Sequence, residues 1–342
     1  MREGRRITTA VALLAALAAL VAGCGEKEEP KGNGGASPEE FTLALDFYVN
    51  PDHAGIYMAL ERGYFEEAGL DVRPQVPSDP SAPVRQVASG RVDLAISYEP
   101  EVILARDQGL PVKAVAALVP RPLTSLIWTG DSGLEDVMDL RGKRVATAGI
   151  PYQAAFLEEI VEEAGLSIDD VQQVDVGFGL LPAVLSGKAD AMLGGFLNVE
   201  GVDLAQRGTN PTVQPVDELG VPTYDELVLV ANEDRLEEDP KAIELFLEAL
   251  ARGTEAAQDD PRAATRAILA AGDGLDPKLT AAEVKRTLPL LTERGSKHEY
   301  GYMDPAEWER FAGFFADAGL IETRPTADEL LTNDHLPGKV AE

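Results

Sequence analysis

The stretch Ala88-Ser89-Gly90-Arg91-Val92-Asp93-Leu94 returns later in the chain as Leu185-Ser186-Gly187-Lys188-Ala189-Asp190-Ala191. In both, a serine and a glycine end a helix-type segment, a cation follows, and an apolar run with one aspartate begins. Such a run after a glycine is typical of a strand buried in a parallel sheet. The repetition therefore predicts two similar α/β halves within one chain.

Both halves alternate strand and helix patterns around this repeated stretch. The first half is predicted to contain strands at 41–47, 71–76 and 92–97 and helices at 53–62 and 84–89. The second half is predicted to contain strands at 144–148, 171–176 and 189–193 and helices at 154–164 and 181–186. Repeated strand-helix-strand units form a parallel sheet with helices on its faces. We therefore expect an α/β fold in which each half is a parallel-rich sheet flanked by helices.

Two extended segments, residues 120–128 and 224–231, are expected to connect the halves. A helical tail follows, with predicted helices at 240–258, 261–271, 281–291 and 305–318. If the tail returns to the first half, lobe 1 comprises residues 41–123 and 229–342, and lobe 2 comprises residues 124–228. Two lobes joined by two extended crossings make a hinge.

The amino-terminal residues have the layout of a bacterial lipoprotein signal. Three arginines within residues 2–6 precede an apolar run at 7–22, and Cys24, the one cysteine of the chain, follows small residues. The run is shorter than the ~20 residues that span a bilayer. We expect residues 1–23 to be a signal peptide, Cys24 to carry lipid, and the Gly-, Pro- and charge-rich residues 24–40 to be a flexible tether.

Composition narrows the function classes. The chain has 59 acidic and 30 basic side chains, a formal charge of −29, which argues against nucleic acid or an anionic membrane surface as a partner. With one cysteine the folded part uses no disulfide, and three histidines, His53, His298 and His335, supply no metal cluster or Ser-His-Asp order. No phosphate loop is present. We expect no catalytic residues, no metal and no cofactor.

The residues that follow the predicted strands are the candidate ligand contacts, because ligands of open parallel sheets bind beyond the carboxyl ends of the strands. These residues are aromatic, acidic or amidic: Asp46, Tyr48, Asn50, His53, Ser97, Tyr98, Phe178, Asn198 and Glu200. Aromatic faces suit a flat ring, and carboxylates accept from ring nitrogens and an exocyclic amine. No arginine stands at these strand ends, which weakens a sulfonate, nitrate or phosphate ligand, although helix N-termini also bind anions.

Each candidate also has a structural interpretation. His53 could cap or pack at the start of its predicted helix, and Tyr48, Tyr98 and Phe178 could fill the core. Glu200 could lie on a solvated face, but if it lies in a cleft it needs a partner.

Several motifs together resemble the bacterial thiamine-pyrimidine-binding lipoproteins, which are related to the fungal thiamine-pyrimidine synthases. The most specific are Asn50-Pro51-Asp52-His53 and Thr332-Asn333-Asp334-His335; Gly63-Tyr64-Phe65 and Asp139-Leu140-Arg141-Gly142-Lys143 are shared more widely. The resemblance covers nearly the whole chain beyond the tether. It implies a two-lobed periplasmic-binding-protein-like fold of type II, with the two crossings as its hinge.

The resemblance also implies a function. Such proteins deliver hydroxymethylpyrimidine or formylaminopyrimidine to an ABC permease with its ATPase. A monomer held by lipid on Cys24 at the extracytoplasmic face of the cell membrane is then expected. The contacts carried over by the resemblance are Asp46, Tyr48, Asn50, His53, Ser97, Tyr98, Asn198 and Glu200; relatives often have a tyrosine within 196–198, where this chain reads Phe-Leu-Asn.

Two other function classes stay open. A protein of the same fold could bind taurine, an alkanesulfonate or nitrate, since only the cleft distinguishes these ligands. An enzyme of pyrimidine biosynthesis is the other class. By the resemblance, the fungal synthases carry a cysteine-rich run and a lysine that holds pyridoxal phosphate, whereas this chain has no cysteine beyond Cys24 and has Ser97 at the position of the lysine. We therefore expect the chain not to be an enzyme.

Overall fold

The computed structural model describes residues 38–292 and 297–338. The predicted signal peptide at 1–23, the lipidation site Cys24 and nearly all of the predicted tether lie outside the described residues. No helix in the described part of the chain has the length and hydropathy needed to cross a bilayer.

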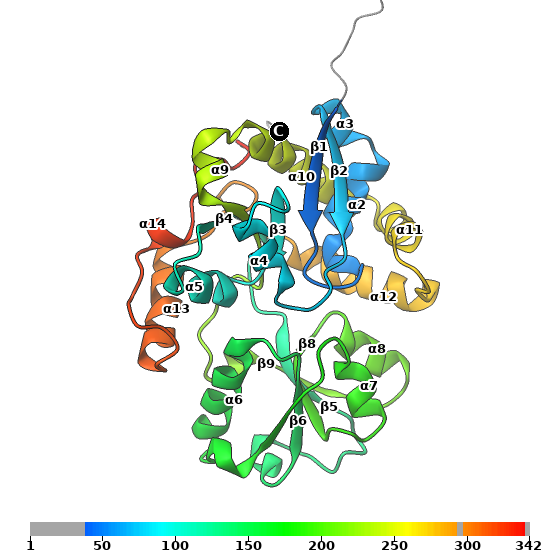
Figure 1. Cartoon of the computed structure of the whole chain (residues 1–342). Coiled ribbons are helices and arrows are strands. Elements are labelled where there is room, and N and C mark those ends of the chain that lie inside the picture. Colours follow the sequence, from blue (N-terminus) through cyan, green and yellow to red (C-terminus); the bar gives the residue numbers. More distant parts are fainter. Residues whose placement is uncertain (1–37, 293–296, 339–342) are drawn as a thin grey trace, which may run out of the picture. The chain divides into compact units, whose positions relative to one another are not determined.

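The described residues contain two sheets of five strands each (Figure 1). The first has the order β2-β1-β3-β10-β4, formed by Leu70–Gln75, Glu39–Ala44, Leu94–Ser97, Leu227–Asn232 and Val112–Val119. The second has the order β7-β6-β8-β5-β9, formed by Gln172–Asp175, Arg144–Thr147, Ala191–Phe196, Thr124–Trp128 and Thr212–Pro215. The two orders correspond strand for strand, which confirms the prediction of two similar α/β halves.

Both sheets are mixed, with three parallel strands in each. β1 runs parallel to β2 and β3, and β6 runs parallel to β7 and β8. β10 and β5 each pair antiparallel with both of their neighbours. The cause lies in the two crossings: β5 and β10 are the strands by which the chain arrives from the other sheet, and each runs against its neighbours. The exact lobe boundaries stay a prediction.

The repeated stretch of the sequence has the same structure in both halves. Gly90 and Gly187 adopt φ of 67° and 69°, a left-handed conformation that suits glycine. The aspartate that follows each glycine accepts from a backbone N–H of the neighbouring strand: Thr42 N donates to Asp93 Oδ2 over 2.7 Å, and Arg144 N donates to Asp190 Oδ2 over 2.9 Å. The repetition thus marks the amino ends of β3 and β8.

Helices cover the sheets and follow the predicted alternation. The helices of the first half before the crossing are α2 (Ala54–Glu61), α3 (Tyr64–Glu67), α4 (Ala82–Ala88) and α5 (Glu99–Asp107). The second half contributes α6 (Pro151–Glu163), α7 (Leu180–Leu185) and α8 (Glu200–Gln206). The tail contributes α9 (Glu233–Glu238), α10 (Lys241–Asp259), α11 (Pro261–Ala271), α12 (Pro277–Thr287), α13 (Pro305–Asp317) and α14 (Ala327–Leu330).

Helices α10 and α11 of the tail pack against α2 of the first half. α10 lies against α2 so closely that a Cβ on Gly253 would overlap the backbone oxygen of Gly55 (Figure 1). The ring of Phe246 on α10 stacks between those of Phe41 and Phe65, with centroids 5.1 and 4.9 Å away. These contacts join the tail to the main hydrophobic core.

The two crossings are tied together by one buried carboxylate, Glu226, which precedes β10. Its Oε2 accepts from the backbone N–H groups of Leu123 and Thr124 over 2.6 and 2.7 Å and from the Tyr224 hydroxyl over 3.0 Å. Its Oε1 accepts from the Thr124 hydroxyl over 2.9 Å. Burial raises the pKa of Glu226 to about 7, even though these bonds lower it.

Candidate functional site

A pocket that is partly open to solvent is lined by residues that follow strands of both sheets. Four of the predicted contacts line it, namely Asp46, Asn50, Tyr98 and Glu200. Other lining residues include Phe47, Thr124, Tyr152, Gln153 and Phe196. The carboxyl ends of the strands therefore face this pocket, as expected for a parallel arrangement of β1, β3, β6 and β8.

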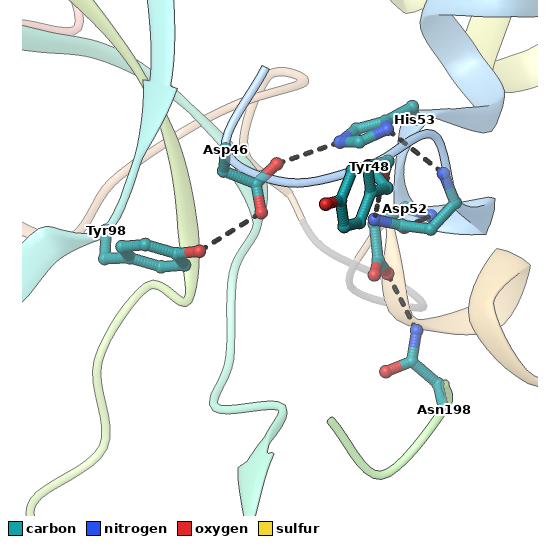
Figure 2. A network of polar contacts seen from close by, with 7 residues as sticks. Asp46, Tyr48, Asp52, His53, Tyr98 and Asn198 are labelled. Atoms are coloured by element: carbon teal, nitrogen blue, oxygen red, sulfur yellow. Dashed lines mark hydrogen bonds and ion pairs between the residues drawn. The ribbon is translucent and has the colours of Figure 1, made fainter. Parts of the chain in front are cut away.

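Asp46 is the most firmly held polar group of the pocket. It follows β1 and is almost fully buried. Its Oδ1 lies 2.8 Å from His53 Nε2, and the Tyr98 hydroxyl donates to its Oδ2 over 3.2 Å (Figure 2). Asn50 N–H donates to His53 Nδ1 over 3.4 Å, so the ring proton belongs on Nε2, from which it is donated to Asp46. These two donors fix the orientation of a carboxylate whose remaining lone pairs are available to a ligand.

The Asn-Pro-Asp-His segment forms a 3₁₀ turn, η1 (Pro51–His53), that places His53. Asn50 caps the turn: its Oδ1 accepts from Asp52 N–H over 2.8 Å, and its Nδ2 donates to the Tyr48 carbonyl over 3.1 Å. Pro51 at the first position fits a turn of this kind. His53 is fully buried and acts on the pocket through Asp46.

Three aromatic rings gather at one side of the pocket. The ring of Phe47, which lines the pocket, contacts Tyr48 and Phe178 at centroid distances of 5.3 and 4.7 Å, and the latter two are 5.0 Å apart. Tyr48 is 55% exposed. Because Phe178 follows β7 and the other two follow β1, the cluster joins segments of both sheets next to the pocket.

The second sheet contributes a carboxyl and an amide. Glu200 is the first residue of α8, and its Oε2 accepts from Phe196 N–H over 2.8 Å. Burial raises the pKa of Glu200 above its ordinary value, although backbone hydrogen bonds lower it. Gln153 accepts from Ala148 N–H over 2.8 Å, and a Cβ on Gly194 would overlap its amide nitrogen. The glycine therefore makes room for this amide.

Asn198 holds segments of the two halves together. Its Nδ2 donates to Asp52 Oδ1 over 2.7 Å (Figure 2). It also donates to Thr287 Oγ1 over 2.8 Å. All three residues are fully buried. Asn198 is not among the described residues that line the pocket, and its role as a ligand contact stays a prediction.

The residues at the end of β3 make contacts with α5 as well as with the pocket. Ser97 donates its hydroxyl proton to Glu101 on α5 over 2.9 Å and is not among the described residues that line the pocket. Burial raises the pKa of Glu101 to about 7. Glu99 is the first residue of α5 and accepts from Asp225 N–H over 2.7 Å. Both carboxyls therefore serve contacts around α5.

Tyr152 and Gln153 are pocket residues that the sequence prediction did not select. They lie in the first turn of α6, directly after the segment that follows β6. Their position after a predicted strand was the signal that could have found them. In residues 38–292 and 297–338, no three His, Cys, Asp or Glu side chains are arranged to hold a metal ion.

Comparison with known proteins places this arrangement in context. Residues 50–264 match the family described as NMT1/THI5 like. The chain is 35% identical over 298 residues to the formylaminopyrimidine-binding protein of Halalkalibacterium halodurans, covering 86% of this chain and 90% of that protein. It is 30% identical over 239 residues to the 4-amino-5-hydroxymethyl-2-methylpyrimidine phosphate synthase of Aspergillus parasiticus, covering 67% and 69%.

Among solved structures, the fold is similar to the alkanesulfonate-binding protein SsuA from Xanthomonas axonopodis pv. citri bound to MOPS. The TM-score is 0.68 at 16% identity, with 87% of this chain and 99% of that chain covered. At this identity the likeness shows a shared fold, the two-lobed fold of periplasmic binding proteins, and nothing about the ligand.

Proposed function

Because this chain belongs to the NMT1/THI5-like family, we propose that it is the substrate-binding protein of an ABC importer for a thiamine pyrimidine precursor. The ligand would be hydroxymethylpyrimidine or formylaminopyrimidine. The relative at 35% identity is a binding protein, and the match covers 90% of its length. The match to the synthase covers 69% of that protein. This difference supports binding rather than catalysis.

The observation that carries the ligand class is the pair of carboxyls, Asp46 and Glu200, in one aromatic pocket. An aminopyrimidine presents an exocyclic amine that donates and ring nitrogens that accept. Asp46, oriented by two donors, accepts from the amine. Glu200, whose pKa is raised, carries a proton more readily than an ordinary glutamate and can donate it to a ring nitrogen. Phe47 and Tyr152 offer ring faces at the same pocket.

The same lining disfavours an anionic ligand. No arginine or lysine is among the described residues that line the pocket, and two acidic side chains are. A sulfonate or nitrate would have to lie near these carboxyls without a cationic side chain to offset them. The pocket therefore fits a neutral or weakly basic ring better than an anion.

The expected setting follows from the same proposal. Lipid on Cys24 would hold the protein at the outer face of the cell membrane, and the ligand-bound form would dock as a monomer on a permease whose ATPase supplies the work. Nucleotide binding is the task of that ATPase.

Calorimetric titration of the purified protein tests the proposal. The ligands are hydroxymethylpyrimidine, formylaminopyrimidine, thiamine, taurine and nitrate. We expect saturable binding of a pyrimidine precursor and no heat from taurine or nitrate. Binding of taurine or nitrate alone would contradict the proposed ligand class while leaving the fold unaffected.

Two variants test the assigned chemistry. Asp46→Asn should weaken pyrimidine binding by about 10- to 100-fold, because a hydrogen bond to a charged acceptor is worth about 1.5 to 3 kcal/mol. Glu101→Gln is the matched control: it neutralises another buried carboxyl of the same half, bonded to Ser97 outside the pocket lining. Its affinity should equal that of the wild type. Equal affinity of both variants would remove Asp46 from the site.

A further inference from the structure

The contact between Asp52, Asn198 and Thr287 is a direct polar link between the two halves. Asn198 stands between β8 and α8, Asp52 lies in η1, and Thr287 is the last residue of α12. Both protons of the Asn198 amide are used, one toward Asp52 Oδ1 at 2.7 Å and one toward Thr287 Oγ1 at 2.8 Å. Figure 2 shows Asn198 reaching Asp52 from a different segment of the chain, and Asp52 in turn lies next to the residues that hold Asp46.

We propose that Asp52, Asn198 and Thr287 form a clasp that holds the two halves in the closed arrangement, and that making the clasp places a proton on Asp52. The clasp does not touch the ligand. It acts on ligand affinity through closure, and that consequence rests on the proposed binding function.

The hydrogen-bond pattern favours a proton on Asp52. Among the described residues, Asp52 Oδ1 accepts from Asn198, while Asp52 Oδ2 and Asn198 Oδ1 accept nothing. An ionised carboxylate with one oxygen buried and unpaired is costly, whereas a neutral acid carries its proton on that oxygen. Burial raises the pKa of Asp52 well above its ordinary value, and the bond from Asn198 offsets this only in part.

The charged groups around Asp52 act in the same direction. Asp46 in the loop after β1, Glu200 on α8 and Glu226 in the second crossing are all acidic, and each raises the pKa of Asp52 further. Repulsion from three neighbouring carboxyls favours the neutral form of the fourth.

The contact between α8 and α12 gathers further acidic groups beside the clasp. Glu283 on α12 is buried, and its pKa is raised to about 7 by burial and by Asp203 and Glu200 on α8. The Arg207 guanidinium pairs with Asp203, so one of these carboxylates is compensated within its own helix. Glu283 and Glu200 add to the same proton uptake when α8 meets α12.

The clasp is linked to the pocket along the chain, because Asn198 is two positions away from two residues that line the pocket. Asn198 lies between Phe196, which lines the pocket and donates its N–H to Glu200, and Glu200 itself. Fixing the Asn198 amide fixes this segment, and with it the Glu200 carboxyl that faces the ligand. Asn198 is therefore a positioning residue, and its loss should appear mainly as a faster ligand dissociation rate.

The sign of the pH effect follows from exposure. When the halves separate, Asn198 no longer shields Asp52 from solvent, and the pKa of Asp52 returns toward its ordinary value. The closed form then holds a proton that the open form has released, so closure is favoured at acid pH and lost as the pH rises. One proton changes the ratio of closed to open forms by up to about tenfold per pH unit.

Distance measurements between spin labels on the two halves test the clasp without ligand. The full chain carries Cys24→Ser, with labels at Glu158→Cys on α6 and Arg266→Cys on α11, two exposed positions. The wild-type background should show a closed-to-open ratio about tenfold or more higher at pH 5 than at pH 8. Asn198→Ala should be mainly open at both pH values.

Asp52→Asn separates the proton from the bond. The asparagine keeps an oxygen that accepts from Asn198 and is neutral at every pH, so more of the closed form should persist at pH 8 than in the wild type and the pH response should become weaker by the contribution of one proton. Asn333→Ala is the matched control, because it removes an amide that makes two hydrogen bonds to Met303 within the tail. It should respond to pH as the wild type does.

Three results would overturn the clasp: distances in Asn198→Ala equal to those of the wild type, an unchanged pH response in Asp52→Asn, or an open wild type at both pH values. Calorimetry with formylaminopyrimidine on the same samples distinguishes the two proposals. Without pyrimidine binding but with the expected distances, the proposed function fails and the clasp stands. If formylaminopyrimidine binds but the spin-label distances do not change as expected, the clasp fails and the proposed function stands.

Discussion

Replacing Glu226 with glutamine should stabilise the protein at pH 8 and change its stability little at pH 5. The carboxyl of Glu226 is fully buried between the two crossings, and its pKa is raised from 4.5 to about 7. Glutamine keeps an oxygen for the donors at Oε2, and its amide can donate to the Thr124 hydroxyl in place of accepting from it. The substitution removes the ionisation and retains the hydrogen bonds.

The magnitude follows from the two pKa values. Between pH 4.5 and about 7 the folded state holds a proton on Glu226 that the unfolded state has released. The free energy of unfolding therefore falls as the pH rises through this window and levels off above it. One pH unit corresponds to about 1.4 kcal/mol, which gives a loss of about 2.5 kcal/mol between pH 5 and pH 8. Glutamine does not suffer this loss.

Urea unfolding at pH 5, 6, 7 and 8 measures the effect. The two tryptophans of the chain, Trp128 in β5 and Trp308 in α13, are fully buried and report on the two halves by fluorescence. The stability of Glu226→Gln relative to the wild type should grow by about 2.5 kcal/mol from pH 5 to pH 8. A difference that stays constant across this range would refute the reasoning.

An alanine control separates the charge from the hydrogen bonds. Glu226→Ala leaves the backbone N–H groups of Leu123 and Thr124 without their buried acceptor. At about 1 to 3 kcal/mol for each buried donor, the loss at pH 5 should be about 2 to 6 kcal/mol. Glutamine at the same pH should show little of it.

Two further substitutions test the tail packing and the pocket. Gly253→Ala places a Cβ against the Gly55 backbone oxygen, so α10 must move from α2 and urea unfolding should show a loss of about 2 kcal/mol or more; an unchanged midpoint would mean that the helices separate freely. Glu200→Ala should weaken pyrimidine binding about tenfold or more while the unfolding midpoint shifts by less than about 1 kcal/mol, as calorimetry and urea titration would show; unchanged affinity would exclude Glu200 from the site.

The sequence predicted the regular elements well where glycine and proline end them. The helix expected at 261–271 has those bounds, and the helix expected at 305–318 ends one residue earlier. α12 begins at Pro277 rather than at residue 281, because Asp276 caps it by accepting from two backbone N–H groups. The cap is formed by residues that are close in sequence, so Asp276-Pro277 was the signal from which the start of α12 could have been predicted.

Long-range burial explains what the sequence could not supply. α5 begins Glu-Pro-Glu, a polar start typical of an exposed first turn, yet Glu99 and Glu101 are both buried there. Burying these carboxyls depends on donors from Ser97 and from Asp225, which is distant in sequence. The role of Asn198 depends likewise on Asp52, 146 residues away. No periodicity in one segment reports partners of this kind.

Residues at the amino ends of the strands make contacts that define the fold, whereas residues at the carboxyl ends line the pocket. At the amino ends of β3 and β8, the repeated glycine and aspartate make the same contacts in both halves, through Asp93 and Asp190. At the carboxyl ends the halves differ: Asp46 follows β1, whereas Ala148 follows the corresponding β6. A repeat that fixes strand starts constrains the backbone on both sides of the pocket but leaves the residues facing the ligand unconstrained. Residues at the carboxyl ends can therefore change with the ligand while the contacts that define the fold stay in place, which is why the repeat predicts the architecture and only the strand ends carry information about the ligand.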